Sequence, residues 1–582
     1  MHRMPVGPRS LLSSGVVACL LSLGSGPAHA QPSTRVYVLD SGARTVTALE
    51  MPTGKRVATV SLEGNPQVML RSPDGRRLIV FDRGPGDDKG DRGYKARGKS
   101  SATVVDPAAM AVVARVELGW GIEPPRWYFS PDGSRLTVLC PGYEAKNPAE
   151  SLIRELVTLD LLTGREASRL TLEHGVLPIL PAKDGQSLVL IQGLPRNAKY
   201  PFPQHRLWLV DLKGPSVAAK VDMGAAASFY TDGVYFYLLD TGKPDKNPQK
   251  SRNGTLQIAS VERRAIENTV DAGRGPRRLV PDEQGGQVFI LSDGPPGGEP
   301  AKGEGELRVV RGATIAATVK VAANPRMVER RGDVLYVVGE RAVTLVDAVG
   351  LGVTATIPLE KGGSGLVDDD DTPTALLTSP DGKRGFVLYG PTGPYSNVKD
   401  KLLVLDLEQR RAVGAVNTGR GGKKFLRTMT IGMGIPYRIY WHTEATGNPW
   451  GLAVRPDGRF AYALNMKTKD VTIVDSTTAE AVEKIGAGGY RLALLTGGAV
   501  LAVVSGSQLH LLDTATNKKI AELELPDLRG LILSPDGAHA VALAERVVLF
   551  LDGATGKVLA RLPDFVKPDA LVFEPLVAPA QP

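Results

Sequence analysis

The chain has little cysteine, few aromatic residues and, beyond its first thirty residues, no long apolar run. Cys19 and Cys140 are the two cysteines among 582 residues, and Phe, Trp and Tyr together make up 5% of the chain. A membrane-spanning helix needs about 20 mainly apolar residues, and no later stretch provides them. These shortages exclude a disulfide scaffold and favour a fold held together by packing.

Neither sign of charge dominates. The chain has 70 Lys and Arg against 62 Asp and Glu, a formal net charge of +8. Glycine (66) and proline (43) are plentiful, which is typical of many short strands joined by turns. A mild charge spread over so long a chain argues against a nucleic-acid partner.

Residues 1–30 have the pattern of a signal peptide. Arg3 and Arg9 precede the apolar stretch "LLSSGVVACLLSLG", and "AHA" at 28–30 is a small-residue cleavage site. We therefore expect an exported protein, periplasmic or extracellular, that begins near Gln31 and has a net charge of about +6 and one thiol. The alternative is lipid attachment at Cys19, because "VVAC" has small residues before the cysteine.

One short pattern recurs along the chain. "RSPDGRRLIVFD" at 71–82 returns as "FSPDGSRLTVLC", "TSPDGKRGFVLY", "VRPDGRFAYALN" and "LSPDGAHAVALA". Each copy follows a short apolar strand, and a second hairpin closes the unit. Proline, aspartate and glycine suit successive positions of a tight turn, because they fix φ, accept turn amides and adopt positive φ.

The second hairpin of most units ends its first strand with an acidic residue. A short acceptor there satisfies turn amides, so we interpret these carboxylates as structural rather than catalytic. They are Glu50, Asp106, Asp160, Asp211, Asp347, Asp406, Asp475, Asp513 and Asp552.

Four antiparallel strands per unit, repeated roughly every 40 to 55 residues, are typical of a β-propeller blade. The stretch "VYVLDSGARTVTALEMPTGKRVATVSLEGNPQVMLRSPDGRR" at 36–77 resembles the YVTN-type β-propeller repeats, of the WD40-like and quinoprotein-amine-dehydrogenase-like propellers. The resemblance covers nearly all of 33–574. It implies an all-β propeller and no particular activity, because such propellers include enzymes, cofactor-carrying subunits and binding proteins.

The pattern indicates eleven units. The first lacks its inner strand, and "PDALVFEP" near 570–573 can supply it from the far end of the chain. Because rings usually have four to eight blades, we expect two propellers, 33–322 and 323–574, with one large ring as the alternative. Residues 575–582 are expected to be a disordered tail.

Insertions fall on one face of the predicted propeller. The longest, 417–447, carries cations beside aromatic rings, which suits an anionic or sugar-like ligand, although it can equally be a packing strap. Its candidate ligand-binding residues are Arg420, Lys423, Lys424, Arg427, Tyr437, Arg438, Tyr440 and Trp441. Arg126, Arg277 and Arg326 follow inner-strand prolines and can form a basic collar at the channel mouth, or inter-blade salt bridges.

Other motifs are weaker. The run Asp368, Asp369, Asp370 and Asp371 can bind Ca²⁺ or form a solvated acidic loop. "GYKARGKS" at 93–100 has the letters of a phosphate loop, but a strand follows it where a helix is needed. We expect no other metal or cofactor and no catalytic residue that the sequence identifies.

These observations favour an exported binding or scaffold protein whose loop-rich face takes a small anionic or sugar-like ligand or a protein of the cell envelope or extracellular space. Two alternatives stay open. One is a hydrolase or lactonase-like enzyme with its site at the channel mouth, and the other is a structural subunit of an envelope complex.

Overall fold

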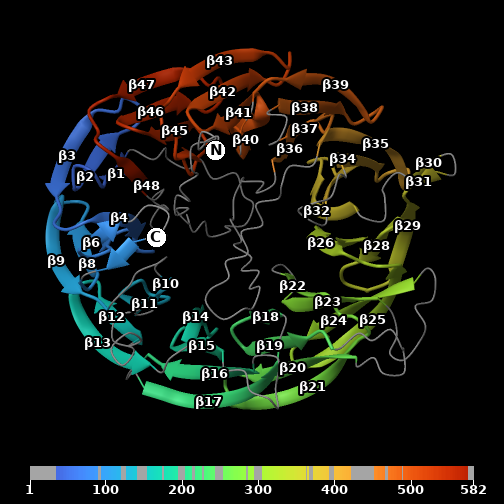
Figure 1. The fold of residues 1–582 in the computed structure, drawn as a ribbon, viewed down its shortest axis with the longest axis horizontal. Helices are drawn as coiled ribbons and strands as arrows, with labels where there is room; N and C mark the ends of the chain where they lie inside the picture. Colours follow the sequence, from blue (N-terminus) through green and yellow to red (C-terminus); the bar gives the residue numbers. More distant parts are fainter. Residues whose placement is uncertain are drawn as a thin grey trace, which may run out of the picture.

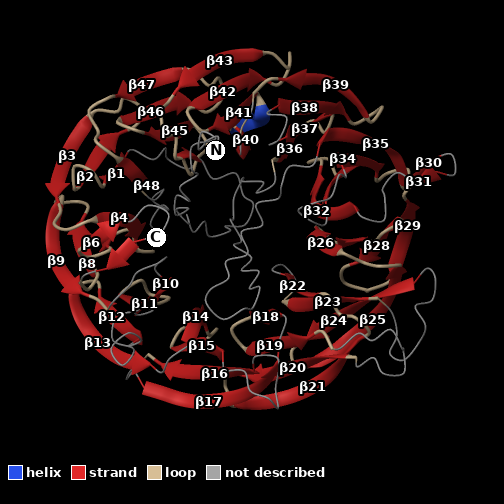
Figure 2. Cartoon of the chain, viewed as in Figure 1, coloured by secondary structure: helices blue, strands red, loops and turns tan. Residues whose placement is uncertain are grey.

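The computed structural model is a single ring of eleven four-stranded antiparallel sheets, a β-propeller (Figure 1). It describes residues 35–88, 94–96, 98–119, 126–140, 154–172, 176–193, 204–212, 216–225, 228–242, 253–282, 286–293, 304–361, 364–365, 371–391, 399–420, 451–465, 470–487, 489 and 491–574. Within these ranges the secondary structure is almost wholly strand, with one 3₁₀ turn, η3 (Thr496–Gly498) (Figure 2). None of the described helical structure is long and apolar enough to span a membrane.

Each blade has four strands from the ring axis outward, and the first six blades are as follows. Blade 1 has β48 (Pro568–Phe573), β1 (Arg35–Asp40), β2 (Thr45–Glu50) and β3 (Arg56–Ser61). Blade 2 has β4 (Pro66–Arg71), β5 (Leu78–Asp82), β8 (Ser101–Asp106) and β9 (Ala111–Glu117). Blade 3 has β10 (Arg126–Phe129), β11 (Arg135–Cys140), β12 (Arg154–Asp160) and β13 (Arg165–Leu172). Blade 4 has β14 (Val176–Pro181), β15 (Ser187–Gly193), β16 (Gln204–Asp211) and β17 (Ser216–Ala225). Blade 5 has β18 (Ser228–Thr231), β19 (Tyr235–Asp240), β20 (Gly254–Ser260) and β21 (Ala265–Gly273). Blade 6 has β22 (Arg278–Asp282), β23 (Gln287–Ser292), β24 (Glu304–Arg311) and β25 (Thr314–Ala322).

The remaining blades complete the ring. Blade 7 has β26 (Met327–Arg331), β27 (Val334–Val338), β28 (Ala342–Asp347) and β29 (Val353–Pro358). Blade 8 has β32 (Asp371–Thr378), β33 (Arg384–Pro391), β34 (Lys399–Asp406) and β35 (Arg411–Arg420). Blade 9 has β36 (Leu452–Val454), β37 (Phe460–Asn465), β38 (Asp470–Asp475) and β39 (Glu480–Ile485). Blade 10 has β40 (Arg491–Leu494), β41 (Val500–Ser505), β42 (Gln508–Asp513) and β43 (Lys519–Glu524), and blade 11 has β44 (Gly530–Leu533), β45 (His539–Ala544), β46 (Val547–Asp552) and β47 (Val558–Leu562). Two small hairpins lie outside the blades, β6 (Gly86–Asp88) with β7 (Tyr94–Ala96), and β30 (Glu360–Lys361) with β31 (Ser364–Gly365).

The preference for two propellers was wrong, and the single ring is correct. A core cluster crosses the expected boundary near 322, because Leu307 and Val319 of blade 6 pack with Val328 and Leu335 of blade 7. The expected completion of blade 1 is confirmed, since β48 pairs antiparallel with β1. The expected leader (1–30) and tail (575–582) lie outside the described residues.

Both faces of each sheet are buried against neighbouring blades. In β27, Leu335 and Val337 pack toward blade 6, whereas Tyr336 and Val338 pack toward blade 8. Successive side chains of a strand point to opposite faces, so a strand covered on both sides is apolar throughout. This explains why the second strands read as continuous apolar runs.

The sheet topology gives the ring two different ends. Turns between first and second strands, and between third and fourth strands, lie on one face, here called the turn face. Connections between second and third strands, and the links between blades, lie on the opposite face, here called the loop face. The longest connection on the turn face has six residues, 72–77.

The Ser-Pro-Asp-Gly turns are built as the sequence indicates. The Ser72 hydroxyl donates to Asp74 Oδ1 at 2.6 Å and accepts the Arg77 N–H at 2.9 Å, while Asp74 Oδ1 also accepts the Arg76 N–H at 3.0 Å. Gly75 has φ +74°, which suits glycine. The same serine-to-aspartate bond recurs at Ser130, Ser379 and Ser534.

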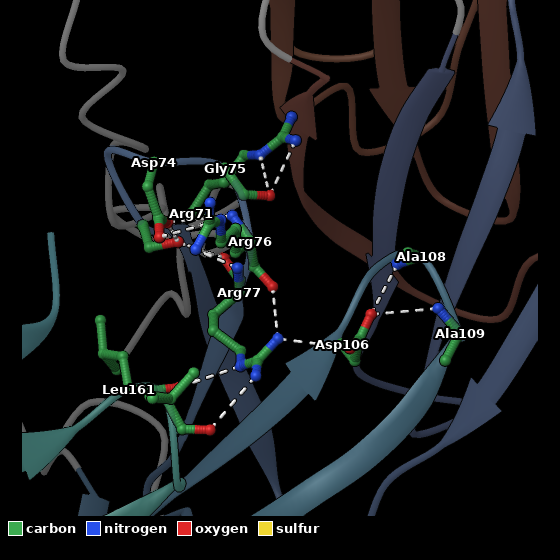
Figure 3. A network of polar contacts seen from close by, with 11 residues as sticks. Arg71, Asp74, Gly75, Arg76, Arg77, Asp106, Ala108, Ala109 and Leu161 are labelled. Carbon is green, nitrogen blue, oxygen red and sulfur yellow. Dashed lines mark hydrogen bonds and ion pairs between the residues drawn. The ribbon is translucent and has the colours of Figure 1, made fainter.

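The side chain of Arg77, the last residue of the first of these turns, joins neighbouring blades on this face (Figure 3). Arg77 Nη1 lies 3.3 Å from Asp106 Oδ2, while its Nε donates to the Leu161 carbonyl of blade 3 at 2.9 Å. Asp106 Oδ1 accepts the Ala108 and Ala109 amides of its own turn. The predicted turn-capping role is confirmed for Asp106, Asp160, Asp347, Asp406, Asp475, Asp513 and Asp552.

A second set of contacts joins the blades on the loop-face side. A polar residue of each of several third strands bonds to the backbone of the preceding blade's outer strand. Thr472 Oγ1 donates to the Thr418 carbonyl and the Ala322 N–H donates to Thr344 Oγ1, both at 3.0 Å, while the Gly224 N–H donates to Gln257 Oε1 at 2.6 Å. In blade 6, Arg308 Nη1 donates to the Asp271 carbonyl at 2.5 Å. These interactions, here called latches, hold the ends of the outer strands.

Asp40 holds the point where the ring closes. Its side chain is 2% exposed, and its carboxylate accepts the backbone N–H groups of Val566 and Lys567 at 2.7 Å and of Ala43 at 2.9 Å. We predict that Asp40→Ala lowers the free energy of unfolding by about 2–4 kcal/mol, because three donors lose a charged acceptor. Denaturant unfolding measures this loss.

The matched control is Asp513→Ala, whose carboxylate caps an exposed turn. We expect it to cost about 1 kcal/mol. Equal losses in the two variants would contradict a special role for the closing carboxylate.

The turn carboxylates also predict acid sensitivity. Hydrogen bonds from the Ser130 hydroxyl and from Ser134 hold the pKa of Asp132 at about 2, and turn amides lower the pKa values of Asp106 and Asp513. The unfolded value is about 3.9, so this stabilisation is complete above that pH and disappears as the pH falls toward 2. Unfolding free energy measured from pH 6 to pH 2 should decrease below about pH 4, less steeply in Asp132→Asn. An unfolding free energy that stays constant across that interval would show that protonation of these carboxylates does not destabilise the fold.

Candidate functional site

The loop face has long connections over one arc of the ring and short connections over the rest. Connections between second and third strands are long in five consecutive blades, 2 to 6, and in blade 8: residues 83–100, 141–153, 194–203, 241–253, 293–303 and 392–398. They are short in blades 1, 7, 9, 10 and 11: residues 41–44, 339–341, 466–469, 506–507 and 545–546. The longest link, between β35 and β36, joins blade 8 to blade 9. Because the turn face stays uniformly short, the loop face is the candidate functional surface.

The first four residues of the predicted ligand-binding insertion, 417–420, belong to β35. Arg420 is the last residue of that strand, where it pairs with Lys399 of β34. The other predicted residues of this insertion lie outside the described residues: Lys423, Lys424, Arg427, Tyr437, Arg438, Tyr440 and Trp441. Their binding role stays a prediction.

The predicted collar arginines occupy equivalent backbone positions. Arg126 is the first residue of β10. Arg277 and Arg326 immediately precede β22 and β26, and their amides donate to the carbonyls of Leu291 and Val338, both at 2.9 Å. Arg529, which the sequence analysis missed, has the same bond to Leu543 at 2.8 Å. It was missed because it lies three residues after Pro526 rather than directly after a proline.

Two of these arginines have their charge compensated. Arg277 Nε and Nη2 donate to the two carboxylate oxygens of Asp293 at 2.9 and 3.2 Å, and Nη2 also donates to Asn324 Oδ1 at 2.6 Å in the link to blade 7. Asn324 in turn donates to Glu340 Oε2 at 2.6 Å. Arg529 forms ion pairs with Asp527 and with Asp569 of blade 1. The ion pair of Arg277 therefore stays within blade 6 and its bond to Asn324 reaches the next link, whereas Arg529 has an ion pair with a neighbouring blade.

A buried charged group lies at the same end of blade 6. Arg308 and Glu306 are 6% and 8% exposed, and Arg308 Nε and Nη2 donate to Glu306 Oε2 at 3.1 and 2.8 Å. Arg308 Nη1 also lies 3.6 Å from Asp271 Oδ1 of blade 5. Arg308 pairs with both Glu306 and Asp271, so we interpret these residues as a contact that supports the packing of blade 6 on blade 5.

The structure describes only one residue of the candidate Ca²⁺ run, and it places strands at the phosphate-loop letters. Asp371 begins β32, whereas Asp368, Asp369 and Asp370 lie outside the described residues. In the part of the chain that the structure describes, no three His, Cys, Asp or Glu side chains gather as a metal site would require. "GYKARGKS" contains β7 and is followed by β8, so strand and not helix comes after it.

The comparisons with known proteins give no family. No protein-family model and no curated protein sequence matches the chain. Among solved structures, "Dihydro-heme d1 dehydrogenase NirN in complex with DHE" is similar at 14% identity over 96% of this chain and 79% of that one, with a TM-score of 0.30. A structure described as "the eukaryotic initiation factor" has 11% identity over 94% of this chain and 99% of that one, with a TM-score of 0.38. Apo AztD from Citrobacter koseri has 10% identity over 85% and 95%, with a TM-score of 0.30. Likenesses this weak carry no argument about activity.

Cys140 ends β11 beneath the loop face. Its side chain is buried, its Sγ accepts the Gly119 N–H at 3.3 Å, and burial raises the pKa of the thiol to about 12. We predict that Cys140 of the folded protein does not react with N-ethylmaleimide at pH 8, because the thiolate is the reactive form. Peptide mass spectrometry measures the modification, with denatured protein as the positive control. Rapid modification in the folded state would contradict the structural role.

Proposed function

We propose that this chain is an exported binding or scaffold protein that uses the loop face of blades 2 to 8 to bind an anionic or sugar-like ligand or a protein partner. One observation carries the proposal. Long connections are concentrated over this arc of the loop face, whereas the turn face keeps connections of six residues or fewer. Loops on a rigid repeat scaffold are where binding residues accumulate.

The composition of residues 417–447 supports the ligand class. Five cations stand against a single acid, Glu444, and four aromatic rings are interleaved with them. Arginine and lysine form strong charge-assisted bonds to anions, and aromatic faces stack on sugar rings or cations. The insertion also continues from β35 of blade 8, which is one of the blades with a long connection on the loop face.

Thermal unfolding in the presence of phosphate, citrate and neutral oligosaccharides tests the proposal. The parent protein is compared with Arg420→Ala/Lys423→Ala/Lys424→Ala. A ligand at about 100 times its Kd stabilises the native state by about 2.7 kcal/mol, which for a chain of this size is roughly 2–4 °C. We expect that shift in the parent protein and not in the variant.

The control variant is Lys55→Ala/Lys518→Ala/Lys557→Ala. It removes the same charge from three exposed turn-face lysines. The proposed ligand class is refuted if no ligand shifts the parent protein, or if the two variants lose the shift equally.

A further inference from the structure

The loop face of blades 10, 11 and 1 forms a compact surface, here called the clasped sector: residues 41–44, 491, 505–507, 525–529, 545–546 and 563–567. Its short turns are hydrogen bonded to the neighbouring links. The amides of Leu525 and Leu528 donate to the carbonyls of Ser507 and Gly506, at 2.7 and 3.0 Å. The Glu545 N–H donates to the Pro526 carbonyl at 2.7 Å, and the Ser41 N–H donates to the Lys567 carbonyl at 2.9 Å. A surface held in this way loses little conformational entropy when a partner binds.

The side chains of three exposed arginines of this sector take part in none of the polar contacts that join the described residues. Arg44 and Arg546 occupy the corresponding positive-φ position in the turns of blades 1 and 11, at +57° and +61°, and Arg491 begins the inner strand of blade 10. Among the described residues none of the three side chains has a hydrogen bond or an ion pair. Elsewhere on the loop face arginines have partners, as Arg115 has Glu63 and Arg277 has Asp293.

The acidic residues of the sector are mostly engaged by other cations. Arg529 pairs with Asp527 and Asp569, and Asp564 lies 4.0 Å from Arg56. Glu545 is the one carboxylate of the described sector without a hydrogen-bonded or ion-paired side chain. Three unpaired arginines against one unpaired glutamate leave a positive surface.

An exposed apolar side chain lies within this positive surface. Val566, in the link from blade 11 to blade 1, is 51% exposed. It packs beside Gly42, where an added Cβ would be 2.6 Å from Val566 Cγ1. Gly42 and Arg44 belong to the same turn, so the valine and an arginine are close neighbours on the surface.

The arrangement selects the kind of partner. The arginines stand on three separate blades, 10, 11 and 1. A protein surface can reach all three, because a typical interface covers about 800 Å² on each side. An apolar residue surrounded by charged ones is also the anatomy of protein interfaces.

We propose that the clasped sector docks an acidic protein surface, with Arg44, Arg491 and Arg546 contacting carboxylates around Val566. The site is separate from the arc of blades 2 to 8 to which ligand binding is assigned above, and it does not rest on that assignment. Arginine suits the role because its planar group bonds carboxylates in a bidentate manner.

The test uses fluorescent poly-L-glutamate as the carboxylate probe, with binding measured by anisotropy at 50 and 300 mM NaCl. The parent protein is compared with Arg44→Ala/Arg491→Ala/Arg546→Ala. We expect binding at low salt that weakens with added salt, and a Kd at least tenfold higher for the variant. Thermal unfolding of both proteins verifies that the ring stays folded.

The control is again Lys55→Ala/Lys518→Ala/Lys557→Ala, which removes equal charge from the turn face. An equal loss of binding in both variants would show that net charge alone attracts the probe and would overturn the proposal. No binding by the parent protein would overturn it as well. Binding of heparin without binding of poly-L-glutamate would assign the sector to a sulfated polysaccharide instead.

Discussion

The pairing of β48 with β1 closes the ring, and the contacts between all other blades depend on it. Each blade is apolar on both faces of its sheet, so a blade with only one neighbour exposes an apolar face to water. A row of eleven such blades has two exposed ends, and only closure removes both. The closing strand comes from the opposite end of the chain, and Asp40 accepts the backbone amides that lead into it. Closure therefore makes stability a property of the whole ring rather than of any one blade.

Polar contacts also hold the blades, and they differ between the two faces of the ring. On the turn face, the serine and aspartate of four turns bond to each other, and Arg77 reaches the next blade through backbone carbonyls. On the loop-face side, latches such as Thr472 to Thr418 hold the strand ends. Because the strands are held at both ends, the fold does not depend on the length of the connections between second and third strands. Insertions can then accumulate on the loop face without disturbing the inter-blade cores, and six blades contain them.

Much of the fold could be predicted from short patterns, since Ser72, Asp74 and Gly75 each have a local reason for their place in a turn. The completion of blade 1 was also predictable, because a missing strand and a spare strand were both visible in the sequence. The size of the ring was not, because it depends on the angle between neighbouring blades, which no local pattern encodes. The latches were missed for a related reason: Thr, Gln and Arg perform one role with different side chains. Arg277 was correctly placed near the ring's inner edge, but its compensation by Asp293 depends on a contact between separate strands.

The arginines of the loop face thus belong to two groups, and the difference bears on function. Arg277 and Arg529 join a link to a neighbouring blade, and the carboxylates that they contact cancel their charge. Arg44, Arg491 and Arg546 contribute to no such contact, although the turns and links around them are hydrogen bonded to one another. An unpaired surface arginine contributes no hydrogen bond or ion pair to the fold, whereas electrostatic complementarity to a partner raises the association rate and orients docking. Under the two proposals above, one face serves two purposes: the long connections of blades 2 to 8 bind a ligand, and the arginines of the clasped sector dock a protein. The two arcs share the same ring, so a partner docked on blades 10, 11 and 1 leaves the loops of blades 3 to 6 uncovered.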